Sequence, residues 1–348
     1  TVLFCFTSLA FASVPCGIRP SSDYSEITGR FRRHIFGGHE VPKGKWPWQV
    51  LVVFANKSDF NSQYAKCGGT IISNQWILTA AHCVIGDFFN GRRDTFEFTV
   101  FAGISDIVED FSQAFSSKVV EWKVHPDFST AQQGDDIALL KLATPIIFND
   151  EIAPICLPHP EQFIPEDGLM VVTTGYGDTS LTDNDNNSAL HEITIPTVNI
   201  DDCEKLMRAL ITSLINIDPK EQKRVEEKIK EEGVFDTFEA YLEAVTKLAL
   251  DEHFEGVFED TICAGSEGHM PLEGDSGGPL MARATDGSWF EIGIASFGPK
   301  HRTKIFPEFV PNVYTNVRKY CEWIEENTEG EARCQDHQVV VEDAPKDE

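Results

Sequence analysis

The sequence predicts a chain built mainly of β-structure. Eighteen prolines and 25 glycines are scattered between short apolar runs, a distribution typical of strands joined by turns. Residues 50–54, 69–72 and 293–296 are the clearest predicted strands. With 348 residues, of which 41% are hydrophobic, the chain can bury a large core as one or two domains.

The N-terminal segment resembles part of a secretory signal. Residues 2–9 are largely apolar, and Ala10-Phe11-Ala12 has the small-x-small form of a cleavage site. We therefore expect residues 1–12 to be a signal-peptide fragment and the protein to be secreted and extracellular. A buried strand or a short anchor is the alternative, although a membrane helix needs ~20 apolar residues.

The run Gly274-Asp275-Ser276-Gly277-Gly278-Pro279 carries a candidate nucleophile. A serine hydroxyl attacks a carbonyl only when a base takes its proton and donors hold the resulting oxyanion. Glycine at 274 lets its N–H approach that oxyanion, and the N–H of Ser276 is the second expected donor. A plain tight loop has the same composition and is the alternative.

Two upstream motifs supply the expected partners of this serine. They are residues 78–83, which contain His82, and residues 135–140, which contain Asp136. We prefer Asp136 to Asp135, which we expect to be a solvated neighbour, because Asp136 directly precedes the apolar run. In these motifs and their order the chain resembles the trypsin/chymotrypsin family of serine proteases over residues 35–328.

The resemblance implies both a fold and a reaction. The fold is all-β, with two six-stranded antiparallel barrels and a C-terminal helix. The reaction is hydrolysis of proteins or peptides, in which His82 acts as general base and then general acid, Asp136 orients its imidazole, and Ser276 forms the acyl-enzyme. Gly274 and Ser276 form the expected oxyanion hole.

The cysteine count fits an oxidising compartment. Removing Cys5 with the signal leaves eight of the nine cysteines, an even number. The resemblance implies the pairs Cys67–Cys83, Cys203–Cys263 and Cys16–Cys156, the last of which ties a propeptide to the catalytic domain. Cys321 and Cys334 are left over and are expected to pair with each other.

The start of the protease domain resembles an activation site. Residues 13–34 are the expected propeptide, and Ile35-Phe36-Gly37-Gly38 resembles the new N-terminus of an activated zymogen. The resemblance implies that the freed ammonium group of Ile35 pairs with Asp275. His34 stands where the family has arginine or lysine, and a cut after Arg33 would leave one residue too many. The exact cut and the activating protease therefore stay open. The basic residues Arg30, Arg32 and Arg33 are either a protease site or a solvated stretch.

The resemblance also places the substrate pocket. Met270 falls at the floor and Asn312 on the wall, and neither is charged. We therefore expect an apolar or small residue before the scissile bond. Ser296-Phe297-Gly298 matches the edge strand that pairs with the substrate backbone, with an ordinary strand end as the alternative. Glu273 is either a rim residue or a solvated one.

Two segments lie outside the family pattern. Residues of about 204–259 are predicted as a helical insertion, with helices over 204–216, from Pro219, and over 235–254. This insertion is either an exosite or lid, or a solvated decoration. The acidic tail, residues 329–348, is predicted to be disordered.

The net charge of −27 argues against nucleic acid or an anionic membrane as a partner. The sequence has no zinc, nucleotide or haem motif, so we expect no metal and no cofactor. The expected partners are substrates, an activating protease and a macromolecular inhibitor of a monomeric enzyme. The alternative function is a catalytically silent homologue that binds a partner through the insertion. An esterase of another fold is disfavoured, because the nucleophile motif is not Gly-x-Ser-x-Gly.

Overall fold

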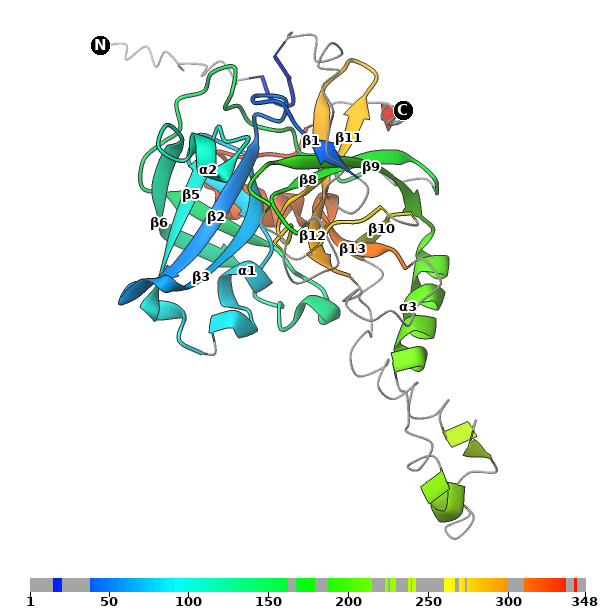
Figure 1. Ribbon diagram of the computed structural model, residues 1–348. Helices are drawn as coiled ribbons and strands as arrows, with labels where there is room; N and C mark the ends of the chain where they lie inside the picture. Colours follow the sequence, from blue (N-terminus) through cyan, green and yellow to red (C-terminus); the bar gives the residue numbers. More distant parts are fainter. Residues whose placement is uncertain are drawn as a thin grey trace, which may run out of the picture.

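The computed structural model describes most of the chain that carries the predicted site. The described residues are 15–20, 38–89, 91–161, 167–178, 187–214, 260–266, 269–272, 274–298, 310–335 and 341–342, with isolated residues between 223 and 241. The expected signal-peptide fragment, His34, Ile35 and Glu273 lie outside them. Figure 1 shows two β-barrels side by side, with helix α3 leading away from the second.

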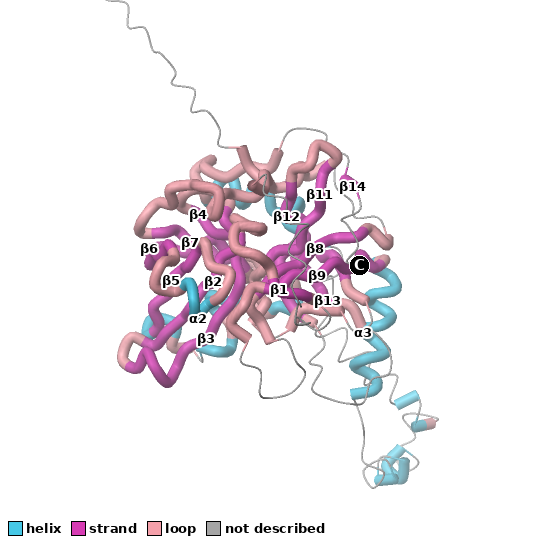
Figure 2. The backbone as a smooth tube through the Cα atoms, turned by 45° about the horizontal axis from the view of Figure 1, so that its top comes forward, coloured by secondary structure: helices cyan, strands magenta, loops and turns pink. Residues whose placement is uncertain are grey.

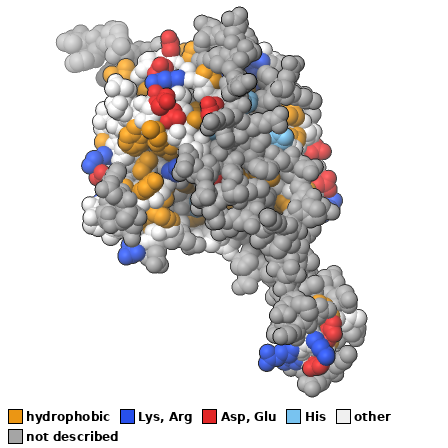
Figure 3. Space-filling view, viewed as in Figure 1, with side chains coloured by type: hydrophobic (Ala, Val, Ile, Leu, Met, Phe, Trp, Pro, Cys, Tyr) orange, Lys and Arg blue, Asp and Glu red, His pale blue; other side chains and the backbone are white. Residues whose placement is uncertain are grey.

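The first barrel is a closed antiparallel ring in the order β2-β3-β4-β7-β6-β5. Its interior is apolar, and Trp76 and Leu78 of β4 are among the fully buried side chains. The exposed large hydrophobic residues include Tyr64, Phe88 and Trp122, all of this barrel, and Figure 3 shows hydrophobic side chains gathered over it. Its strands are β2 (Gln49–Asn56), β3 (Asp59–Ile71), β4 (Trp76–Thr79), β5 (Phe96–Ala102), β6 (Phe115–Val124) and β7 (Ala138–Leu142).

The second barrel closes through the pairs β8·β9, β9·β10, β10·β13, β13·β12, β12·β11 and β11·β8. These strands are β8 (Met170–Gly175), β9 (His191–Val198), β10 (Thr261–Ala264), β11 (Pro279–Ala284), β12 (Trp289–Phe297) and β13 (Asn312–Asn316). The short strand β1 (His39–Glu40) pairs with β9, and the short strand β14 (Val341–Glu342) pairs with β11, both antiparallel. The expected fold of two six-stranded antiparallel barrels is confirmed.

In the described part of the chain, the helices for which both ends are defined lie outside the barrels (Figure 2). They are α1 (His82–Ile85), α2 (Ile107–Asp110), α3 (Ile200–Leu214) and the expected C-terminal helix α6 (Cys321–Asn327), with 3-10 turns η2 (Asp87–Phe89), η3 (Arg93–Thr95), η4 (Ala131–Gln133) and η6 (Val317–Tyr320). Among the described residues, no helix is both long and apolar enough to cross a membrane.

Helix α3 begins four residues earlier than predicted. The side-chain oxygen of Asn199 accepts the N–H of Asp201 at 2.9 Å, so Asn199 caps the helix. Asp201 and Asp202 then lie in the first turn, where negative charge is favourable. The two further helices predicted for the insertion lie for the most part outside the described residues.

Four disulfides join the pairs expected above, Cys16–Cys156, Cys67–Cys83, Cys203–Cys263 and Cys321–Cys334. The last of these holds the start of the C-terminal tail against α6. Further on, Glu342 pairs with Arg283 at the edge of β11. These two attachments depart from the disorder predicted for residues 329–348, because composition alone does not reveal a covalent link or a free sheet edge.

Candidate active site

His82 and Asp136 lie next to the ends of two neighbouring strands of the first barrel. β4 ends at Thr79, which pairs with Ala138 at the start of β7. Because the strands are antiparallel, the end of β4 lies beside the start of β7. His82, three residues beyond β4, therefore meets Asp136, two residues before β7. The imidazole Nδ1 lies 2.7 Å from Oδ2 of Asp136, and the backbone N–H of His82 donates to Oδ1 at 2.8 Å.

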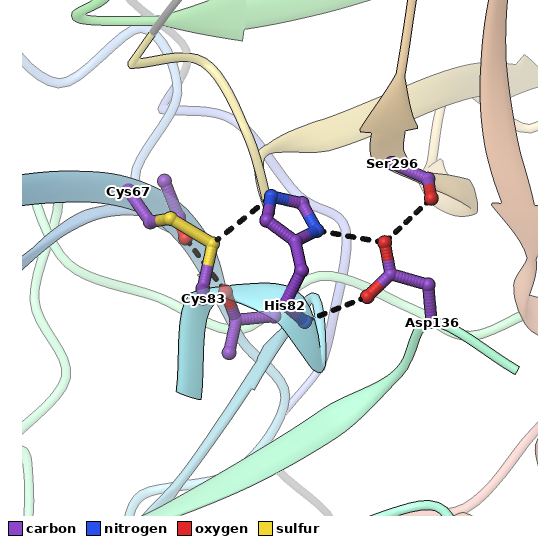
Figure 4. The surroundings of a disulfide bond; sticks show 7 residues. Cys67, His82, Cys83, Asp136 and Ser296 are labelled. Carbon is purple, nitrogen blue, oxygen red and sulfur yellow. Dashed lines mark hydrogen bonds and ion pairs between the residues drawn. A yellow bond between two sulfur atoms is a disulfide. The ribbon is translucent and has the colours of Figure 1, made fainter. Parts of the chain in front are cut away.

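Asp136 is fully buried and receives further support from the second barrel. The hydroxyl of Ser296 donates to Oδ2 of Asp136 at 2.5 Å, as Figure 4 shows. Burial by itself raises the pKa of the Asp136 carboxyl, but the His82 charge and the hydrogen bonds outweigh it, and the net shift is downward. Asp136 is therefore held ionised, and an ionised carboxylate accepts the Nδ1–H of the histidine.

The same contact changes the basicity of His82. Burial lowers the pKa of the imidazole, whereas the charge of Asp136 and its hydrogen bond raise it, and the net shift is upward. The other ring nitrogen, Nε2, points toward Sγ of Cys83, 3.8 Å away (Figure 4). Both His82 and Ser276 are described, and no hydrogen bond joins Nε2 to the Ser276 hydroxyl. Hydrogen bonds between catalytic groups are often long before substrate binds.

Ser276 lies just before β11 of the second barrel, in a loop held by strands of both barrels. The Ser276 carbonyl accepts the N–H of Gly68 in β3 at 2.8 Å, and the N–H of Gly277 donates to Ala295 in β12 at 2.8 Å. Gly274 has φ 98° and Gly277 has φ 76°, conformations that favour glycine. A side chain at 277 would also lie 2.3 Å from the Thr79 hydroxyl, so the loop packs closely against β4.

The Asp275 carboxylate is buried against the glycines that end and follow β8 of the second barrel. It accepts the N–H of Gly177 at 2.7 Å and that of Leu272 at 2.9 Å. A Cβ atom added at Gly175 or Gly177 would lie 2.0 or 2.6 Å from the carboxylate, which explains the two glycines of this turn. Burial raises the pKa of Asp275 to about 6, against the lowering effect of these donors and of Lys66. The expected partner, Ile35, lies outside the described residues.

The predicted pocket residues lie on adjoining segments. Met270 is buried. The Asn312 side chain contacts the segment after Met270 and lies close to the end of β12. Its Nδ2 donates to the Pro271 carbonyl at 3.4 Å, and a Cβ atom added at Gly298 would lie 2.5 Å from the same nitrogen. Its Oδ1 is buried without a hydrogen-bond partner. Phe297 ends β12 beside Gly298.

Asp135 differs from the expected solvated neighbour. Its φ is 52°, and its carboxylate accepts the Tyr320 hydroxyl at 3.1 Å and lies 3.4 Å from His125 Nδ1. This left-handed turn separates the directions of Asp135 and Asp136.

Two contacts of Asp136 were also missed from the sequence: the Ser296 hydroxyl donates to its carboxylate, and the Thr315 hydroxyl donates to its backbone carbonyl at 3.0 Å. Both contacts join residues that are far apart in the chain. The only related signal is that Ser296 and Thr315 lie on neighbouring strands, β12 and β13.

Metal binding was not expected. Among the described residues, Cys67, His82 and Cys83 bring three metal-type donors within 4.8 Å of one another. The two sulfurs are bonded to each other, so neither is available as the thiolate that a metal needs.

The chain is similar to known proteins over most of its length. The trypsin family model matches residues 35–226 and 237–324. Tryptase of Mus musculus is 30% identical over 304 residues, which cover 84% of this chain and 88% of that protein. The clotting factor G beta subunit of Tachypleus tridentatus is 29% identical over 329 residues, which cover 93% of this chain and 86% of that protein.

Proposed function

Because the chain belongs to the trypsin family of serine proteases, we propose that it is a secreted serine endopeptidase, made as a zymogen, that cleaves after apolar or small residues. The observation that carries the proposal is the His82–Asp136–Ser296 chain of hydrogen bonds, centred on the buried Asp136 carboxylate, beside the Ser276 loop. A buried carboxylate supported in this way keeps a neutral imidazole in the tautomer whose Nε2 can accept a proton.

In the proposed reaction, Ser276 Oγ attacks the scissile carbonyl while His82 Nε2 takes its proton. The negative charge of Asp136 stabilises the imidazolium that forms. The carbonyl oxygen becomes an oxyanion held by the N–H groups of Gly274 and Ser276. His82 then gives the proton to the leaving amine, and water, activated by the same histidine, hydrolyses the acyl-enzyme.

The preference for apolar or small residues rests on Met270 and Asn312. Met270 offers no charge to a lysine or arginine side chain of the substrate. The Asn312 amide, which contacts Pro271 and lies close to Gly298, limits how far any side chain can enter. Profiling a peptide library tests this preference, and cleavage after arginine or lysine in the library would contradict it.

Zymogen activation rests on Asp275 and on the propeptide. The buried Asp275 carboxylate has two backbone donors, and the ammonium group of a free Ile35 is the counter-ion that the proposal gives it. The Cys16–Cys156 disulfide and the packing of Gly17 against Trp289 attach residues near the chain start to the second barrel. The residues of the proposed propeptide, 13–34, therefore stay linked to the protease domain after a cut near His34.

The second candidate is a catalytically silent homologue that binds a partner through the insertion. It is favoured by Asn312, which restricts the pocket, and by His34 at the cleavage position. Labelling with a fluorophosphonate before and after cleavage at Ile35, with Ser276→Ala as the control, separates the two. If only the cleaved wild-type protein is labelled, the result supports the zymogen. If the cleaved protein is not labelled although sequencing finds Ile35 at its N-terminus, the result supports the silent homologue.

A further inference from the structure

One face of strand β3 touches the Ser276 loop at successive positions. Side chains on a strand alternate, so residues 66, 68 and 70 share a face. Gly68 donates to the Ser276 carbonyl, and a Cβ at Gly68 would lie 2.8 Å from the Cα of Gly278. Thr70 donates to Glu291 of β12 at 3.0 Å. Lys66 is therefore the next residue along a face that packs against the second barrel.

The Lys66 side chain crosses over Gly274. A Cβ placed at Gly274 would lie 2.9 Å from Cε and 3.7 Å from Nζ of Lys66. The half-buried ammonium group donates to the Tyr176 carbonyl at 2.5 Å. Tyr176 lies between the two glycines whose lack of a Cβ makes room for the Asp275 carboxylate. One side chain of the first barrel thus contacts both the oxyanion glycine and the turn that holds Asp275.

The charge of Lys66 matters in addition to its length. Asp275 is fully buried, and the Lys66 ammonium is the cation that favours its ionised form among the described residues, while Asp178 opposes it. An apolar side chain of equal length would fill the same space, but it would leave the Tyr176 carbonyl without this donor and Asp275 without this positive charge.

We propose that Lys66 is a positioning residue that holds the oxyanion loop in place by linking Gly274, Tyr176 and Asp275. The inference rests on the proposed endopeptidase function. Lys66 acts through Gly274 and takes no part in proton transfer. Its removal lets the Gly274 N–H move from the place where the oxyanion forms, which weakens transition-state binding and leaves ground-state binding intact.

The test compares Lys66→Met with wild type in the full chain cleaved at Ile35. Removing an oxyanion donor costs 10²–10³-fold in kcat, so displacing one is expected to cost on the order of 10-fold or more, with KM unchanged. Lys66→Arg, which keeps the charge, is expected to recover most of the rate. Lys118→Met is the matched control, because Lys118 is exposed on the same barrel and pairs with Glu97 at 2.8 Å.

Rates are expressed per active site, and the thermal midpoint of each variant is recorded. A folded Lys66→Met with wild-type kcat, or with a change in KM alone, overturns the proposal. If that variant does not fold, Lys66→Gln, which keeps one donor without the charge, must still lower kcat at constant KM. An inactive cleaved wild type would instead refute the endopeptidase function itself, so the two failures are distinguishable.

Discussion

Replacing Gly175 by alanine is expected to inactivate the enzyme without unfolding it. Gly175 does not have a positive φ, so alanine fits the backbone there. The new Cβ, however, would lie 2.0 Å from Oδ1 of Asp275, a distance that forces the carboxylate to move. The displaced carboxylate loses the N–H groups of Gly177 and Leu272, at 2.7 and 2.9 Å. Hydrogen bonds to a charged group contribute about 1.5–3 kcal/mol each, so the active arrangement loses roughly 3–6 kcal/mol.

An energy loss of this size lowers the activity by at least about 100-fold, since each 1.4 kcal/mol is tenfold. The assay is kcat/KM of the cleaved variant on the best library peptide, together with its thermal midpoint. Gly287→Asn is the control, because Gly287 has a positive φ of 87° in a turn between β11 and β12, away from Asp275. It should lower stability without lowering the rate. A Gly175→Ala enzyme of near wild-type activity would refute the role given to the Asp275 carboxylate.

Three further predictions follow from the same contacts. The kcat/KM of the cleaved enzyme should fall as pH decreases through a pKa above 6.5, because Asp136 raises the pKa of His82 and only the neutral imidazole accepts a proton; a pH–rate profile checks this. Burial raises the pKa of Glu291 well above 4.5, so the folded state binds its proton more tightly than the unfolded state does. The resulting stabilisation is complete at pH values below the unfolded pKa of Glu291, and it is lost as pH rises through the folded pKa. Glu291→Gln should flatten this part of the stability–pH curve in denaturant titrations, and an unchanged slope would argue against it. After activation, a reducing gel should show two chains, whereas a non-reducing gel should show one. The Cys16→Ser variant should release the smaller chain on the non-reducing gel as well.

The β-rich character of the chain and the tight turn around Ser276 could be predicted because their causes are local in the sequence. Proline and glycine between short apolar runs predict strands and turns, whereas the two six-stranded barrels were implied by the family resemblance and are confirmed. The glycines around Ser276 are needed by the turn itself: Gly274 and Gly277 both have positive φ. His82 and Asp136 meet because each lies beside the end of a strand, and the family resemblance had implied their pairing.

The contacts that support the site could not be predicted, because they join residues distant in the chain. Ser296 donates to a carboxylate 160 positions away, and Lys66 donates to a carbonyl 110 positions away. Hydrophobic periodicity contains no information about such pairs. Asp135 was assigned to solvent for the same reason, since its partner Tyr320 is 185 positions away. The start of α3 was placed late because a leucine pattern marks the helix body, whereas the capping Asn199 marks its beginning.

The central claim is that Ser276 forms a covalent acyl-enzyme with the help of His82. The most direct measurement is intact and peptide mass spectrometry of the cleaved protein mixed with an activated ester of a small apolar acyl group and quenched in acid. We predict one acyl group, located on Ser276, in the wild type, and none in His82→Ala or Ser276→Ala. An unmodified Ser276 in cleaved wild-type protein, or equal acylation of the His82→Ala variant, would contradict the account.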